Sequence, residues 1–203
     1  MKNFLKFILI LSITICLQNG VFANNTLKDI QIGNEDAPIT IIEYRSLTCS
    51  HCAEFSKSTF PELKEKYIDT GKIKFRLRPF ALNAIDLNAF RLLHCSSEED
   101  FFNLEKLLFK DQDKWIITSP NDQALQNSTD ALGKYGLLFG ITKEEYEECL
   151  ADEEITDFIL TMRMEGSQKY NINSTPSFVV NDEVYGGNKT FKEFEIILEK
   201  SLN

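Results

Sequence analysis

Apolar and polar side chains alternate along this chain with the period of strands in some stretches and of helices in others. Ile39–Arg45 is a β-branched, apolar run interrupted by one acid, which predicts a buried strand. Lys72–Pro79 alternates charged and apolar residues, the period-two pattern of a half-buried strand. Three further short strands are expected, at Ile30–Ile32, Ser177–Asn181 and Glu183–Gly187.

Helical periodicity follows the first predicted strand and fills the middle of the chain. Ala53–Tyr67 carries apolar residues near the helical period, and Pro61 is expected to kink this helix rather than end it. The pattern is helical again from Ala84 to Gly166, and a closing amphipathic helix is expected over Phe191–Leu202. Four residues are expected to separate the helices of the middle stretch: Pro120, Gly133, Gly136 and Gly140.

Two cysteines, two residues apart, lie between the predicted strand and the predicted helix. Cys49 and Cys52 can close a small disulfide ring, and the start of a helix stabilises the thiolate that opens it. His51, between them, can donate a hydrogen bond or a positive charge to the Cys49 thiolate, which would make the disulfide more oxidising. The pattern indicates redox chemistry.

Zinc binding is the alternative interpretation of these cysteines, because the same spacing serves half a zinc site. Structural zinc sites usually draw on a second closely spaced pair, which this chain lacks, so we expect no metal. The possible ligands are Cys49, His51, Cys52, His94, Cys95 and Cys149, and His94 is better interpreted as a packing or surface residue.

Two further features lie at strand ends. Pro176, preceded by Thr175, stands at the mouth of the strand that begins at Ser177, where a cis proline in a turn fits. Glu43, in an otherwise apolar strand, either points to solvent or is buried beneath the cysteines. A buried carboxyl has a raised pKa and can exchange a proton with a thiol.

With these residues the chain resembles the DsbA-like branch of the thioredoxin superfamily, a family of extracytoplasmic dithiol–disulfide oxidoreductases. The likeness rests on the Cys49-to-Cys52 motif with histidine in third place, on Thr175-Pro176 before a strand, and on an acid six residues ahead of Cys49. It implies that Cys49 attacks, that Cys52 resolves, and that the backbone at Thr175 and Pro176 pairs with an extended substrate. For Glu43 it implies a proton relay to the resolving thiol.

The resemblance also implies an α/β fold class, a thioredoxin fold with an inserted helical domain. The thioredoxin-like domain would comprise residues 24–83 and 166–203, and the helical insertion residues 84–165.

The first 23 residues have the three parts of a secretory signal peptide: Lys2 and Lys6, an apolar stretch over residues 7–17, and a small-residue cleavage site ending at Ala23. The apolar stretch is shorter than the roughly 20 residues that span a bilayer, which disfavours a retained anchor. Cys16 invites lipidation, but the bulky residue before it does not fit the small-residue pattern. Export to the periplasm is therefore expected.

Removal of this segment would leave 20 basic and 31 acidic residues, a net charge of −11. That balance opposes nucleic-acid binding, which depends on cations that face phosphates. Four cysteines would remain in an oxidising compartment. With Cys49 and Cys52 in the active ring, Cys95 and Cys149 are expected to form a structural disulfide, the alternative being two buried free thiols.

The functional prediction is a periplasmic thiol–disulfide oxidoreductase, an oxidase that donates the Cys49–Cys52 disulfide to exported cysteine-containing proteins. A disulfide isomerase or reductase that uses the same dithiol is the alternative, and Thr175 before the proline resembles isomerases. A redox-inactive, chaperone-like binding module is the alternative from another class. The expected protein is a monomer without a cofactor, reoxidised by a membrane quinone-linked protein.

Overall fold

A five-stranded mixed sheet forms the centre of the computed structural model, which describes residues 27, 29–119 and 123–202. The strand order is β1-β3-β2-β4-β5. β2 and β3 run parallel, and the other neighbours are antiparallel. The strands are β1 (Ile30–Ile32), β2 (Ile39–Arg45), β3 (Ile73–Pro79), β4 (Ser177–Val180) and β5 (Glu183–Gly186).

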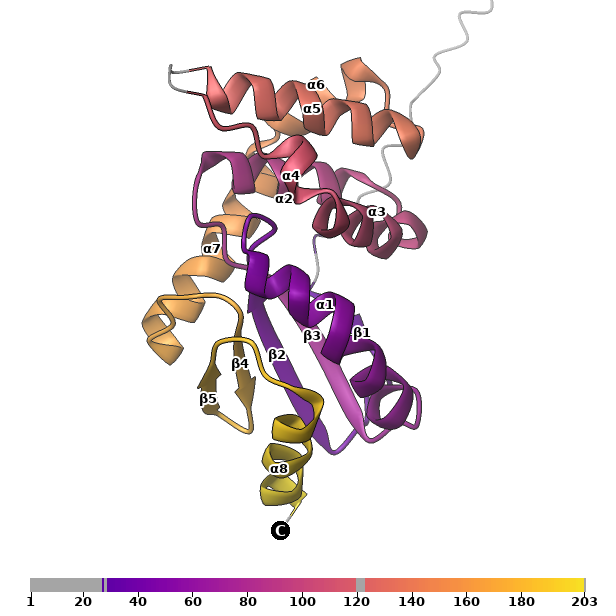
Figure 1. Cartoon of the computed structure of the whole chain (residues 1–203), viewed down its shortest axis with the longest axis vertical. Coiled ribbons are helices and arrows are strands. Elements are labelled where there is room, and N and C mark those ends of the chain that lie inside the picture. The colour runs from indigo at the N-terminus through magenta and orange to yellow at the C-terminus, as the bar shows by residue number, and fades with distance from the viewer. Residues whose placement is uncertain (1–26, 28, 120–122, 203) are drawn as a thin grey trace, which may run out of the picture.

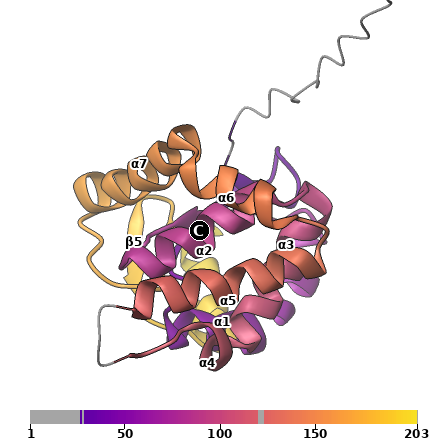
Figure 2. The ribbon, with the colours of Figure 1, turned by 90° about the horizontal axis from the view of Figure 1, so that it is seen from above.

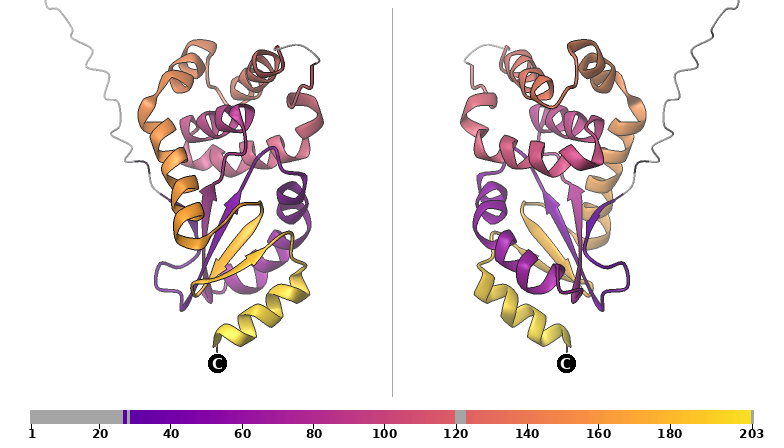
Figure 3. Two further views of the ribbon diagram at one scale, coloured as in Figure 1. Left: turned by 90° about the vertical axis from the view of Figure 1, so that its left-hand side faces the viewer. Right: turned by 90° about the vertical axis from the view of Figure 1, so that its right-hand side faces the viewer.

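Helices cover both faces of this sheet. α1 (Ser50–Leu63), which continues into the π-helical turn η1 (Lys64–Ile68), lies on one face together with α8 (Phe191–Leu202). α7 (Glu153–Tyr170) lies on the other face (Figure 3). β2 buries apolar side chains on both faces, with Ile41 on one and Tyr44 on the other, as expected for a central strand. In β3 the apolar residues Ile73, Phe75 and Leu77 share one buried face, and charged residues alternate with them, as the sequence pattern predicts.

The remaining helices form a layer beyond one end of the sheet, next to the start of α1 (Figure 1). Seen from above, this layer lies over the sheet end, with α4 close to α1 (Figure 2). The helices are α2 (Ala84–Cys95), α3 (Glu98–Lys110), α4 (Gln112–Trp115), α5 (Ala124–Leu138) and α6 (Lys143–Ala151). The predicted α/β class with a helical insertion is confirmed.

Aromatic rings pack α1 and α8 against the sheet. The Phe55 ring centroid lies 4.7 Å from that of Phe178 and 5.7 Å from that of Phe194. On the opposite face, a Cβ atom at Gly166 of α7 would lie 2.7 Å from the Tyr44 ring, so only glycine fits there. Full burial of these rings explains the apolar periodicity of the elements that carry them.

Several predicted elements match closely. The strands Ile30–Ile32 and Ile39–Arg45 and the helix Phe191–Leu202 have the predicted bounds, and Pro61 lies inside α1 without ending it. The prediction that Gly133 and Gly136 separate helices is wrong, because both lie inside α5.

Close helix packing accounts for those two glycines. A Cβ atom at Gly133 would lie 3.1 Å from Tyr146, and one at Gly136 would lie 3.1 Å from Leu92. Gly140 does follow the end of α5, with a positive φ of 78°. Pro120 lies outside the described residues.

The division into a thioredoxin-like part and an insertion remains a proposal. α7 runs without a break across residue 166, where the second boundary was expected, and it contacts both β3 and α2. The proposed signal peptide, with Cys16, lies outside the described residues. In the part of the chain that the structure does describe, no helix has the length and apolar character that crossing a membrane requires.

Candidate active site

The loop from β2 to α1 carries both cysteines of the motif. Cys49 is the N-cap of α1, and its carbonyl accepts the first helical hydrogen bond, from the Ala53 N–H at 3.1 Å. Cys49 is partly exposed, whereas Cys52, one turn further on, is fully buried. Both are free thiols. One sulfur is therefore open to an incoming chain, and the other lies beneath it.

The surroundings of Cys49 favour its thiolate and lower the pKa of Cys49 to about 5. The largest cause is the Cys52 thiol, which can donate a hydrogen bond to the Cys49 sulfur, and partial burial opposes it. The Thr175 hydroxyl and the backbone N–H groups of Cys52 and His51 add to the lowering. Donors at a helix start stabilise a thiolate in this way.

Cys52 has the opposite character. Burial raises its pKa, and the thiolate of Cys49 and the charge of Glu43 add to that shift. The Ser46 N–H, 3.5 Å from the Cys52 sulfur, opposes that shift. Cys52 is thus held as a thiol while Cys49 ionises.

The loop before β4 lies directly against Cys49. The Thr175–Pro176 peptide is cis, the geometry that the sequence predicts. The Cys49 thiol donates to the Thr175 carbonyl at 3.3 Å. The Thr175 hydroxyl is buried and makes no hydrogen bond within the described residues, so it is available to a thiolate.

Glu43 is fully buried, which decides between the two positions that its strand allowed. Its carboxylate is bound to the Arg45 guanidinium, and Arg45 also donates to Glu105 of α3 at 2.5 Å. Burial raises the pKa of Glu43 to about 7, against the opposing effect of Arg45, and Glu105 and Cys49 raise it further. This carboxyl can therefore change protonation near neutral pH.

The two histidines differ. The His51 side chain is exposed, and its contribution to the Cys49 thiolate comes from the backbone N–H. His94 packs in the insertion, with its ring 5.7 Å from Phe101 and 5.2 Å from Phe158. Burial lowers the pKa of His94 to about 4, as expected for a neutral packing residue.

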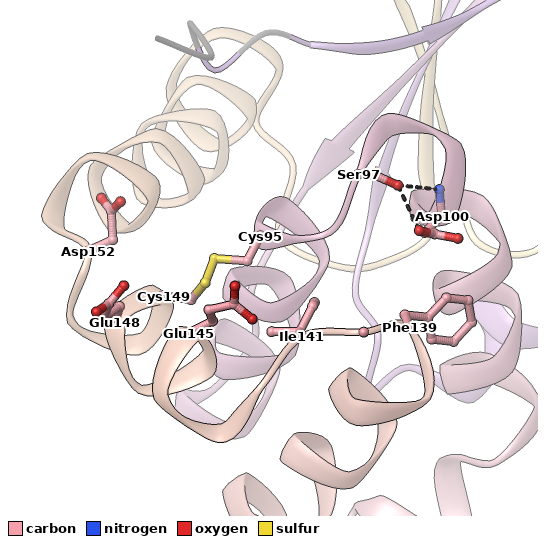
Figure 4. A pocket seen from close by; sticks show the side chains of 10 residues that line it. Cys95, Ser97, Asp100, Phe139, Ile141, Glu145, Glu148, Cys149 and Asp152 are labelled. Carbon is pink, nitrogen blue, oxygen red and sulfur yellow. Dashed lines mark hydrogen bonds between the residues drawn. A yellow bond between two sulfur atoms is a disulfide. The ribbon is translucent and has the colours of Figure 1, made fainter. Parts of the chain in front are cut away.

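Cys95 and Cys149 form a disulfide between α2 and α6, with their Cα atoms 6.1 Å apart. Both cysteines line a hollow of about 410 Å³. Figure 4 shows their disulfide among the other side chains that line it. Within the described residues, no group of three or more histidine, cysteine or acidic side chains could hold a metal ion. The hollow is lined mainly by acids and small residues: Ser97, Asp100, Gly140, Glu145, Glu148 and Asp152.

Sequence reasoning missed four residues around the site. Arg45 binds Glu43 and Glu105, and Asp86 and Gln112 bind the backbone of the loop that leads to Cys49. Opposite charges two positions apart in a buried strand, at Glu43 and Arg45, could have indicated an internal ion pair, since side chains at that spacing share a face. Glu105 could have been found as a carboxylate within the apolar face of α3. Gln112 carries no such signal.

Comparisons with known proteins agree with this geometry. A family model described as thioredoxin matches residues 25–200. A Rickettsia bellii protein named as a protein-disulfide oxidoreductase is 37% identical over 180 residues, which cover 87% of this chain and 67% of the relative. A Rickettsia conorii protein of the same description is 35% identical, with 86% of this chain and 61% of the relative covered. The chain therefore spans about three fifths of the length of several such relatives.

Solved structures show the same likeness. The crystal structure of Wolbachia pipientis alpha-DsbA1 superimposes with a TM-score of 0.74 and 34% identity, over 85% of this chain and 90% of the other. The fold and the cysteine pair beside a cis proline define a thioredoxin-fold dithiol protein. The chain belongs to the thioredoxin family, and within it to the DsbA-like thiol–disulfide oxidoreductases.

Proposed function

We propose that this protein is a thiol–disulfide oxidase of the periplasm that donates its Cys49–Cys52 disulfide to exported cysteine-containing proteins. The observation that carries the proposal is the asymmetry of the two sulfurs. Cys49 is partly exposed with its pKa lowered to about 5, while Cys52 is buried with its pKa raised. A stabilised Cys49 thiolate favours the reduced protein, which makes the disulfide a stronger oxidant.

In the reaction, a substrate thiolate attacks the Cys49 sulfur of the ring. The Cys49–Cys52 bond breaks, a mixed disulfide forms on Cys49, and Cys52 leaves with the electron pair and takes up a proton. A second substrate thiolate then attacks the mixed disulfide and releases the Cys49 thiolate. Two electrons have passed from the substrate to the cysteine pair.

Neighbouring groups support each step. The Thr175 carbonyl, 3.3 Å from the Cys49 sulfur, offers an acceptor to the backbone of an extended substrate. Pro176 holds this carbonyl in place. Glu43, buried beside the dithiol with a pKa of about 7, can supply and recover the proton of Cys52. The exposed His51, between the two cysteines, would add positive charge near the Cys49 sulfur.

The redox potential of the Cys49–Cys52 pair against glutathione tests the proposal, together with disulfide transfer to a reduced peptide. An oxidase should lie nearer to about −120 mV than to about −270 mV, and it should oxidise the peptide in stoichiometric amounts. A potential near the lower value would instead support a reductase. Disulfide transfer to the peptide at the background rate would support the third hypothesis, a binding module that does not exchange disulfides.

An isomerase remains the second candidate, because the threonine before the cis proline is a polar residue beside the sulfurs. Refolding of a protein with scrambled disulfides separates the two functions. An isomerase restores the native pairing catalytically, and an oxidase does not. The remaining proposals concern the setting: reoxidation by a membrane quinone-linked protein, action as a monomer, and no bound cofactor.

A further inference from the structure

The short loop between β2 and Cys49 is held by a buried carboxylate from the helical layer. Asp86 of α2 is fully buried, and its Oδ1 accepts the Leu47 N–H at 2.8 Å. Its Oδ2 accepts the Leu82 N–H at 2.9 Å, at the start of the same layer. Burial raises the pKa of Asp86 to about 6, and hydrogen bonds from the Ser46 hydroxyl and from the N–H groups of Leu82, Leu47 and Thr48 oppose that shift. One side chain thus serves several donors of the loop.

A second side chain of the same layer holds the carbonyl groups of this loop. Gln112, at the start of α4, donates from Nε2 to the Leu47 carbonyl at 2.7 Å and to the Cys49 carbonyl at 3.1 Å. Asp86 therefore binds N–H groups and Gln112 binds C=O groups of one loop. Both side chains come from the helical layer, whereas the loop connects strand β2 to α1.

The loop so held presents donors to the dithiol. Ser46 donates its N–H to the Cys52 sulfur at 3.5 Å, and its carbonyl accepts the Cys49 N–H at 3.3 Å. Cys52 is the leaving group when a substrate thiolate opens the ring, so negative charge grows on the atom that the Ser46 N–H faces. A donor fixed in advance stabilises such charge more than one that must first reorient.

We propose that Asp86 and Gln112 are positioning residues of the redox centre, which fix the Ser46–Cys49 loop so that its Ser46 N–H meets the departing Cys52 sulfur. The proposal deepens the proposed function and rests on it for the direction of the reaction. The helical layer then acts on the chemistry through this loop, in addition to covering the sheet end.

Asp86→Asn tests the carboxylate, because the amide keeps the shape but has only one acceptor oxygen for the two N–H groups at Leu47 and Leu82. The rate at which a dithiothreitol thiolate reduces the oxidised centre should fall about tenfold, and the Cys49 pKa, read from the pH profile of alkylation, should rise. Asp100→Asn is the matched control. Asp100 occupies the same place after the N-cap of α3, yet it binds its own cap residue, Ser97.

Gln112→Met tests the other half, since methionine has similar length and cannot donate. Gln126→Met on α5, where the amide donates to the nearby Asp130, is its control. We expect a several-fold slower reduction for Gln112→Met and parental rates for both controls. In the double variant Asp86→Asn/Gln112→Met, the fold decrease in the rate of reduction should be no larger than the product of the fold decreases in the two single variants, because both residues act through one loop.

Reduction by a small thiol reports on the ring itself, so this test does not depend on whether the protein is an oxidase. An Asp86→Asn protein with a lower unfolding temperature, but with the parental rate of reduction and the parental Cys49 pKa, would overturn the inference. The hydrogen bonds of Asp86 to the loop would then serve stability only. Should Asp86→Asn fail to fold, Gln112→Met decides: a parental rate rejects the inference. If the parent protein does not oxidise the peptide, the proposed function is rejected, and the inference about Asp86 and Gln112 is unaffected.

Discussion

The two cysteine pairs of this protein lie at opposite ends of helices. Cys49 is the N-cap of α1, where unpaired backbone N–H groups stabilise a negative charge. Cys95 is the last residue of α2, and Cys149 lies in the last turn of α6, where unpaired carbonyl groups disfavour one. Four carboxylates line the hollow beside the second pair. We therefore expect a disulfide to be labile at the first site and protected at the second.

This difference shows that a cysteine pair acquires its chemistry from the backbone and charges around it. Beside Cys49 stand the carbonyl and hydroxyl of Thr175, and the charge of the buried Glu43, which is paired with Arg45, raises the pKa of Cys52. The Cys95–Cys149 pair has no corresponding arrangement among the described residues, and it joins two helices of the insertion. We therefore expect redox turnover at the first pair only.

The largest expected effect comes from removing the attacking sulfur. Cys49→Ala should abolish disulfide transfer, whereas Cys52→Ala should trap mixed disulfides with substrates, because the neighbouring Cys52 thiol, which can attack and resolve the Cys49 mixed disulfide, is missing. Non-reducing electrophoresis and mass spectrometry of the trapped species check this. Cys95→Ala/Cys149→Ala is the control and should retain transfer. Complexes that accumulate with the Cys49 variant instead would reverse the assignment of the two roles.

The second pair should matter for stability. Closure of a loop of 54 residues contributes about 4 kcal/mol in the chain-entropy model, so Cys95→Ser/Cys149→Ser should lose about that much free energy of unfolding. Urea unfolding measures the loss, and mass spectrometry of the unreduced parent should find the peptide that links the two cysteines. Two free thiols in the mature protein would refute the bridge. The redox potential of the variant shows whether the bridge also affects the active pair.

The reduced and oxidised proteins should differ in how their stability depends on pH. The pKa of Cys49 is lowered from 9.0 to about 5 on folding, and a group lowered in this way loses its stabilising contribution as pH falls through the folded pKa. As pH rises from 5 to 9, the free energy of unfolding of the reduced protein should therefore increase relative to that of the oxidised protein. After allowance for solvent screening at this partly exposed thiol, we expect a gain of about 2 kcal/mol.

Urea unfolding of both redox forms at pH 5, 7 and 9 measures this difference. The pKa of Glu43 is raised on folding to about 7, so its contribution has the opposite sign and is lost as pH rises from about 4.5 to 7. Comparison of the two forms removes the part of this contribution that they share. A constant difference across the three pH values would contradict a lowered Cys49 pKa.

Much of the fold was predictable because it depends on local pattern. The apolar run of β2, the helical period of α1 and α8, and the cysteine spacing each occupy one short stretch. The sequence alone could not predict the bonds from Asp86 and Gln112 to the active loop, because they join residues 39 and 65 positions away from Leu47. The prediction that Gly133 and Gly136 separate helices is wrong for the same reason, because these glycines allow close contact with residues of other elements, Tyr146 and Leu92.

The smallest expected effect concerns His51, whose position in the motif suggests an electronic role. Its side chain is exposed, and its backbone N–H, which lowers the Cys49 pKa, survives substitution. His51→Leu should therefore raise the Cys49 pKa by about one unit or less, which corresponds to about 1.4 kcal/mol at most. The redox potential should fall in step, because the same thiolate stabilises the reduced form. Ser50→Ala, at the exposed neighbour, controls for a general change at the helix start. If a folded His51→Leu protein keeps the parental potential, the backbone N–H carries the whole contribution of this residue, and the imidazole is only a spacer.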